Sequence, residues 1–215
     1  MGNFNRNITI KVSMIYPRKT IEQLTLEFDR IPAERRRALQ KLTSFVEGAP
    51  SPSLVFICTH NSRRSHIAQV WAATAAAWYN IPGVNAYSGG TEATEFNPRA
   101  INALKEIGFQ IEQKTSAPNP RYSVRYSTGH PAFEVYSKKY DAPENPASNF
   151  AAVMTCTHAD ENCPVVTGAS SRISLPYDDP KDFDGTTQEA AKYLERCREI
   201  GREILYAFSQ IKSRC

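Results

Sequence analysis

The hydrophobic pattern of this chain changes between short apolar runs and apolar residues at helical spacing. The runs at 54–57 and 150–155 are nearly continuous, as is typical of strands buried in a parallel sheet. Two further segments, 84–88 and 172–175, are also expected to be strands. Strands and helices alternate after residue 50, which favours an α/β fold. The predicted helices lie at 20–28, 32–46, 65–79, 98–107 and 187–213.

The first two helices precede the first predicted strand and form a separate region. We interpret residues 1–48 as a helical extension that packs on the domain or forms a homodimer. The basic run 35–37 within it is expected to be a solvated helix face. A boundary at 50–52 (Pro-Ser-Pro) separates the extension from the main domain, 49–215. Within this domain, residues 114–149 are expected to be a long insertion folded over the functional site.

Composition agrees with a soluble enzyme. With 215 residues, of which 41% are hydrophobic and 22% charged, the chain can form a full core. It has no window of about 18 apolar residues and no apolar segment at its start, so neither a membrane span nor a secretory signal is expected. The net charge of +4 suits an anionic substrate without indicating nucleic acid. Five cysteines without an extracellular pattern indicate a reducing, cytoplasmic setting, and Cys197 falls on the buried stripe of the last helix.

The strongest chemical signal is the segment 58–65, Cys-Thr-His-Asn-Ser-Arg-Arg-Ser, which joins a predicted strand to a predicted helix. Unpaired N–H groups and the dipole at the start of the helix favour an anion there. The same field, together with Arg63 and Arg64, favours the thiolate form of Cys58. The planar fork of Arg64 can hold two oxygens of a tetrahedral oxyanion, and Ser65 can donate to the Cys58 sulfur. The alternative is a buried, inert cysteine beside solvated arginines.

This loop and three further segments resemble the low-molecular-weight protein tyrosine phosphatases, and most closely the thioredoxin-coupled arsenate reductases that share their fold. The further segments are 87–91 (Tyr-Ser-Gly-Gly-Thr), Asn97-Pro98 and Asp179-Pro180. The resemblance implies a three-layer α/β sandwich with a four-stranded parallel sheet, to which the N-terminal helices are added. In such a sheet the loop lies at the carboxyl end of the first strand, where ligands bind.

The resemblance also implies roles for individual residues. Cys58 attacks the oxyanion, Arg64 holds it, and Asp179 acts as general acid. The proline after Asp179 stiffens the loop that carries the acid, although an Asp-Pro pair alone is also an ordinary turn. The residues implied to bind the oxyanion are Thr59, His60, Asn61, Ser62, Arg63, Arg64 and Ser65.

Four positions depart from the pattern of the family. His60 stands where a glycine is usual, which narrows the approach to the loop, and Arg63 makes the loop more cationic. Lys181 replaces an aromatic residue that the phosphatases tend to carry after the Asp-Pro pair, which argues against phosphotyrosine as the natural substrate. Gln69 replaces an acidic cation ligand of some reductases, which counts against such a cation site. Neither a metal nor a cofactor is expected.

A second pair of cysteines, Cys156 and Cys163, follows the third predicted strand. The resemblance implies a redox relay, in which Cys156 displaces arsenite from Cys58 and Cys163 then forms a disulfide with Cys156 that thioredoxin reduces. A spacing of seven residues is two helical turns, so the segment must partly unwind to close that bond. Two unrelated thiols are one alternative. A metal site that includes His158 is another, although no fourth ligand is evident.

The expected function is therefore the reduction of arsenate to arsenite, with an arsenate or phosphate oxyanion as ligand and thioredoxin as reductant. The alternative is hydrolysis of a phosphomonoester or a protein phosphotyrosine through a phosphocysteine, which does not need Cys156 or Cys163. A third hypothesis is a regulator that binds an oxyanion but leaves Cys58 unreacted. No nucleic-acid or membrane partner is expected.

Overall fold

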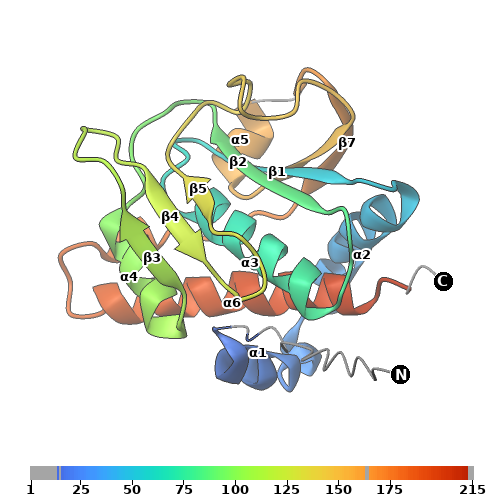
Figure 1. Cartoon of the computed structure of the whole chain (residues 1–215), viewed down its shortest axis with the longest axis horizontal. Coiled ribbons are helices and arrows are strands. Elements are labelled where there is room, and N and C mark those ends of the chain that lie inside the picture. The colour runs from blue at the N-terminus through green and yellow to red at the C-terminus, as the bar shows by residue number, and fades with distance from the viewer. Residues whose placement is uncertain (1–13, 15, 163–164, 213–215) are drawn as a thin grey trace, which may run out of the picture.

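The computed structural model describes residues 14, 16–162 and 165–212. Its centre is a parallel sheet of four strands in the order β2-β1-β6-β7 (Figure 1). This confirms the predicted fold class, and each of the four predicted strands is present. The strands are β1 Ser53–Cys58, β2 Asn85–Gly90, β6 Phe150–Met154 and β7 Ala169–Ser174. Because β1 pairs with both β2 and β6, its last residue, Cys58, lies in the middle of the carboxyl edge of the sheet.

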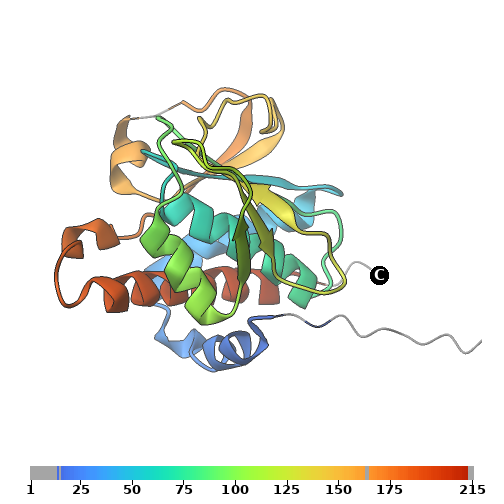
Figure 2. The ribbon, with the colours of Figure 1, turned by 60° about the vertical axis from the view of Figure 1, so that its left-hand side comes forward.

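Helices cover the two faces of this sheet unequally. One face packs on α2 (Ala33–Gly48), α3 (Arg64–Trp78) and α6 (Glu189–Ser209), while the short α5 (Thr157–Asn162) lies on the other (Figures 1 and 2). The helices predicted at 65–79 and 98–107 correspond to α3 and α4, and the last predicted helix ends earlier than expected, at Ser209. The remaining helical segments are α1 Arg18–Thr25, η1 Phe28–Arg30, α4 Pro98–Ile107 and η2 Pro180–Phe183.

The segment 114–149 contains more regular structure than its composition suggests. A second, antiparallel sheet is formed by β3 Gln110–Gln113, β4 Tyr122–Arg125 and β5 Phe133–Val135. Tyr122 and Val124 are buried, so β4 shows the alternation of a half-buried strand, which the high Pro and Ser content obscured. After β5 the chain runs beside the end of β2, where Gly90 donates to the carbonyl of Lys138 and accepts from the amide of Tyr140.

The two N-terminal helices pack on α6 rather than standing apart from the domain. Their apolar stripes belong to the main core of the protein; the buried residues are Ile21, Leu24, Leu39, Leu42 and Val46. The expectation that the basic run 35–37 is a solvated face was wrong for two of its three members. Arg35 pairs with Glu203 of α6, and Arg36 donates to the carbonyls of Phe28 and Ile31. Helical spacing could not reveal this, because Glu203 comes from a distant helix and the carbonyls of Phe28 and Ile31 belong to the turn that precedes α2.

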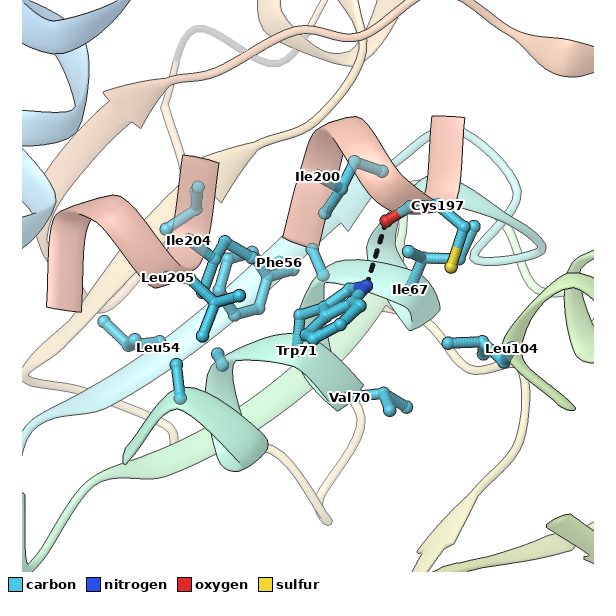
Figure 3. Close-up of a cluster of buried hydrophobic side chains, with 14 of the residues drawn as sticks. Leu54, Phe56, Ile67, Val70, Trp71, Leu104, Cys197, Ile200, Ile204 and Leu205 are labelled. Carbon is cyan, nitrogen blue, oxygen red and sulfur yellow. Dashed lines mark hydrogen bonds between the residues drawn. The ribbon is translucent and has the colours of Figure 1, made fainter. Parts of the chain in front are cut away.

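The largest buried side chain, Trp71 of α3, fills the space between α3 and α6 (Figure 3). Its indole N–H donates to the carbonyl of Cys197 at 2.9 Å, so the polar atom of the ring is satisfied inside an apolar cluster. Cys197 is fully buried there, as predicted. None of the helices in the described part of the chain combines the length and apolar character that a membrane span requires.

Candidate active site

The shape of the loop that follows β1 is fixed by contacts among its own side chains. Asn61 has a φ of 45° and is fully buried, and its amide donates to Ser65 Oγ at 2.9 Å. Ser65 Oγ in turn lies 3.1 Å from the Cys58 sulfur. Asparagine tolerates this left-handed conformation better than most residues, which gives Asn61 a structural reason to be here. The backbone N–H groups of residues 60–64 have no acceptor among the described residues, which suits them to bind an anion.

Segments far away in the sequence support this loop. The carbonyl of Thr59 accepts from the amide of Glu92 at 2.8 Å, and the carbonyl of His60 accepts from Ser137 Oγ at 3.0 Å. Gly90 of β2 lies close to the backbone of the loop. A Cβ added at this position would be 2.6 Å from the Thr59 carbonyl oxygen and 2.7 Å from the Asn61 nitrogen. The second glycine of the segment 87–91 is therefore required by the close approach of the backbones. Ser137 belongs to the segment 114–149 that was expected to fold over the site, but the sequence did not single out this residue.

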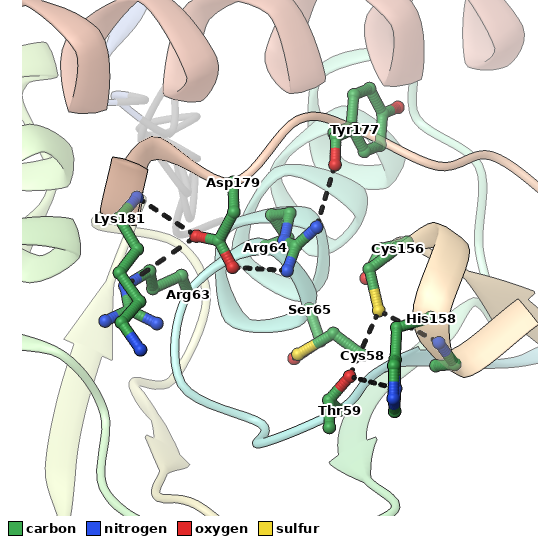
Figure 4. Close-up of polar contacts among 12 residues, drawn as sticks. Cys58, Thr59, Arg63, Arg64, Ser65, Cys156, His158, Tyr177, Asp179 and Lys181 are labelled. Carbon is green, nitrogen blue, oxygen red and sulfur yellow. Dashed lines mark hydrogen bonds and ion pairs between the residues drawn. The ribbon is translucent and has the colours of Figure 1, made fainter. Parts of the chain in front are cut away.

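Arg64 and Asp179 meet at one side of the loop (Figure 4). The Nη1 of Arg64 donates to the carbonyl of Tyr177 at 2.8 Å, and its Nη2 donates to Asp179 Oδ2 at 2.5 Å. The Nε of Arg64 is buried and has no hydrogen-bond partner among the described residues. Asp179 also accepts from the amide of Lys181 at 3.1 Å, so the carboxylate is fixed at the start of η2. The fold thus brings together two residues that are 115 positions apart.

Arg63 is engaged on the outer side of the loop. Its Nε donates to the hydroxyl of Tyr193 at 2.9 Å, and its guanidinium lies 3.9 Å from Asp184 and 4.0 Å from Asp179. Burial, together with a hydrogen bond to Asp184, raises the pKa of Tyr193 to about 12, so it stays a neutral hydroxyl. Tyr193 and Asp184 were not found from the sequence, where they look like ordinary residues of a helix and a turn.

Cys156 lies against the same loop. Its sulfur accepts from the amide of Ala159 at 3.3 Å and lies 3.6 Å from Thr59 Oγ1, which itself lies 3.2 Å from Nδ1 of His158 (Figure 4). Cys156 is buried in the same apolar cluster as Cys58, with 1% and 3% of their surfaces exposed. The fold therefore brings Cys156 next to the residue that follows Cys58. Cys163 lies outside the described residues.

The remaining positions of interest lie at the periphery. Half of the His60 side chain is exposed, and its Nε2 lies 3.7 Å from Glu92. Gln69 is buried; its amide donates to the carbonyl of Ala86, while its Oε1 has no partner among the described residues. In the described part of the chain, no three or more His, Cys, Asp or Glu side chains are grouped so that they could hold a metal ion.

Comparison with known proteins agrees with this geometry. The family model of the low molecular weight phosphotyrosine protein phosphatases matches residues 53–125. An arsenate reductase of Halalkalibacterium halodurans is 31% identical over 152 residues, which cover 70% of this chain and 91% of that protein. The chain belongs to the low-molecular-weight phosphotyrosine protein phosphatase family. The resemblance inferred from the motifs is thereby confirmed, and this member of the family is an enzyme.

A second relative of this chain is also an arsenate reductase. An arsenate reductase of Staphylococcus aureus strain Newman is 30% identical over 164 residues, which cover 75% of this chain and 97% of that protein. Among solved structures, one described as an arsenate reductase in the phosphate binding state aligns with a TM-score of 0.47 and 18% identity, over 75% of this chain and 99% of that one. That structural similarity is too low to bear on function.

Proposed function

We propose that the protein reduces arsenate to arsenite through a thiol relay that begins at Cys58 and is regenerated by thioredoxin. The observation that carries this proposal is the position of Cys156, which lies in contact with Thr59 beside the oxyanion loop. Hydrolysis of a phosphate ester does not need a second thiol at this place. The arsenate reductases among the relatives support the same choice of substrate.

In the first step the oxyanion occupies the loop. It accepts hydrogen bonds from the N–H groups of residues 60–64 and from Nε of Arg64, the groups that have no acceptor in the described residues. The Cys58 thiolate attacks arsenic, so that an S–As bond forms and an As–O bond breaks. Asp179 in its protonated form donates to the departing oxygen, which leaves as water. Ser65 keeps the Cys58 sulfur in place through its hydroxyl.

In the second step the Cys156 thiolate attacks the sulfur of Cys58. A disulfide forms, the S–As bond breaks, and its electron pair reduces As(V) to As(III), which leaves as arsenite. The Thr59 hydroxyl can pass the proton of Cys156 to Nδ1 of His158, since it lies within reach of both. The amide of Ala159 stabilises the resulting thiolate. Two electrons from two thiols balance the reduction.

In the third step Cys163 attacks Cys156, which frees Cys58 and leaves a Cys156–Cys163 disulfide for thioredoxin. This step rests on the sequence spacing and on the shortness of α5, which spans only the residues between the two cysteines. Unwinding such a short helix costs little free energy. We propose a reducing cytoplasm as the setting, because the relay starts from free thiols. A homodimer through residues 1–48 stays a prediction, and the apolar stripes of α1 and α2 are buried within the chain.

The test is NADPH oxidation that depends on arsenate, in the presence of thioredoxin and thioredoxin reductase. The native chain should turn over many times, whereas Cys156→Ser should stop after one turnover or less. Non-reducing mass spectrometry of Cys163→Ser should then show a trapped Cys58–Cys156 disulfide. Continued turnover of arsenate by Cys156→Ser would rule out the thiol relay.

Hydrolysis of phosphate esters is a second candidate, favoured by the constellation of Cys58, Arg64 and Asp179, which suffices for a phosphocysteine mechanism. It predicts steady release of phosphate from a simple aryl phosphate, at a rate that survives Cys156→Ser. No arsenate turnover together with that result would make the enzyme a phosphatase.

A further inference from the structure

The acid loop, residues 176–179, is held by an arginine from the N-terminal helices. Arg35 lies in α2, before the residues that the family model matches. Its Nε and Nη2 donate to the two oxygens of Glu203, at 2.9 and 2.5 Å, and its Nη1 donates to the carbonyl of Pro176 at 3.1 Å. The guanidinium therefore uses all three of its nitrogens. The side chain of Glu203 is only 3% exposed, so the pair is well shielded from water.

The same guanidinium lies over the ring of Tyr177, with its central carbon 4.8 Å from the ring centre. Tyr177 is 5% exposed, and its backbone carbonyl is the acceptor for Nη1 of Arg64. Two residues further on, Asp179 binds Nη2 of Arg64. Arg35 thus touches Pro176 and Tyr177 of the acid loop, and the carbonyl of Tyr177 orients the arginine of the oxyanion loop.

A purely structural role would tie α2 to α6 through Glu203 and nothing more. Two observations go beyond it. The third donor of Arg35 is directed at the acid loop and not at α6, and the stacking contact is made with a residue of that loop. A buried ion pair is in itself weak evidence for stability, because desolvation offsets much of the attraction. Bidentate geometry does fix the orientation of a guanidinium, which is what a positioning role requires.

We infer that Arg35 is a positioning residue of the active site, and that the N-terminal helices complete the site by setting the acid loop. Arg35 fixes the backbone at 176–177, which aims Arg64 at the oxyanion and sets Asp179 beside it. This inference rests on the proposed roles of Arg64 and Asp179, which arsenate reduction and phosphate ester hydrolysis share. It does not depend on which of the two reactions is the natural one.

The test compares one double variant with a matched control. Arg35→Met leaves Glu203 buried without a partner and can fail to fold, so Arg35→Met is combined with Glu203→Met, which replaces the pair by apolar side chains of similar length. The control is Glu27→Gln, because Glu27 ties the N-terminal region to Arg198 and Arg202 of α6 without touching the acid loop. Arg35→Lys retains the charge but cannot serve Glu203 and Pro176 together.

The double variant should fold with a thermal midpoint near that of the native chain, yet lose about 10- to 100-fold in kcat, as expected when catalytic groups are misplaced by about an ångström. Glu27→Gln should stay within about twofold of the native kcat, and Arg35→Lys should fall in between. Among aryl phosphates, the loss should be larger for a poor leaving group such as phenol than for 4-nitrophenol, because only the poor one needs the acid. Backbone hydrogen exchange at 176–179 should become faster.

A double variant with native kcat, the native dependence on the leaving group and unchanged exchange at 176–179 would overturn the inference. If the native chain turns over neither arsenate nor aryl phosphates, the proposed function fails separately. Hydrogen exchange at 176–179 and the affinity for inorganic phosphate then decide the role of Arg35. Both quantities should change in the double variant and stay native in Glu27→Gln. A double variant in which neither quantity changes would again overturn the inference.

Discussion

Two buried cysteines of this protein, Cys58 and Cys197, have opposite surroundings. Cys197 lies in the apolar core between α3 and α6, where burial raises the pKa of its thiol to about 12. Cys58 is 3% exposed, but Ser65 lies 3.1 Å from its sulfur, and the backbone N–H groups of the loop that follows have no acceptor within the part of the chain that the structure describes. Burial alone therefore does not separate an inert thiol from a reactive one. The polar groups directed at the site make the difference.

The sharpest way to test this comparison is to remove each thiol. Cys58→Ser should lower turnover of arsenate, or of an aryl phosphate, by at least about 10³-fold, because the nucleophile is lost. Cys197→Ala should keep the native kcat and lose only about 1 kcal/mol of folding stability, as expected for a small cavity. Steady-state kinetics and urea unfolding measure the two effects. Equal losses of activity in the two variants would contradict a reactive Cys58 beside an inert Cys197.

Glycines near the two cysteines extend the comparison. Gly90→Ala should lower kcat by about 10- to 100-fold, because the new Cβ meets backbone atoms of Thr59 and Asn61 and displaces the oxyanion loop. The measurement is kcat beside the affinity for inorganic phosphate, which should fall as well. A variant with native values for both would mean that the loop can yield without losing its shape.

The matched substitution in the core is Gly201→Ala. Its Cβ would meet the ring of Trp71 instead of the loop. It should therefore cost about 1–3 kcal/mol of folding stability, partly offset by the better helix propensity of alanine, and leave kcat of the folded enzyme unchanged. Chemical unfolding and kcat per folded molecule check this pair. A fall in kcat at Gly201 would show that the core between α3 and α6 also controls the loop.

A buried amine beside the loop provides a comparison across pH. Burial is the main cause that lowers the pKa of Lys138 from 10.5 to about 8. Between these two values the unfolded chain binds more protons than the folded one, so stability should rise with pH. Lys138→Met lacks this contribution. Relative to it, the native chain should gain up to about 3 kcal/mol between pH 7 and 10.5. Urea unfolding of both proteins across that range measures the gain. If the free energies of unfolding of the two proteins change in parallel with pH, the pKa of Lys138 is not lowered by burial.

The smallest effect is expected at His158. His158→Ala removes the group that lies within reach of Thr59, so the attack of Cys156 should slow and arsenate turnover should fall by about 3- to 10-fold. Hydrolysis of 4-nitrophenyl phosphate, which does not use Cys156, should be unaffected. Equal losses in both assays would mean that His158 stabilises the oxyanion loop and does not act in the relay.

Much of the fold followed from local patterns. The continuous apolar run before Cys58 and the apolar stripe at helical spacing in the last helix predicted β1 and α6, and Gly108 ended α4 where expected. The antiparallel strand β4 was missed, because only Tyr122 and Val124 alternate in a segment dominated by loop-forming residues. A two-residue alternation is too short to be separated from chance.

The sequence by itself determined which chemical groups the oxyanion loop carries, because eight adjacent residues contain the thiol, the arginines and the start of a helix. Only the tertiary structure decided what that loop meets. Arg64 binds a carboxylate 115 positions away, Cys156 lies against Thr59, and Arg35 reaches the acid loop from a helix that looked solvated. Spacing along the chain carries no information on such contacts, since they are set by how helices and strands pack on one sheet.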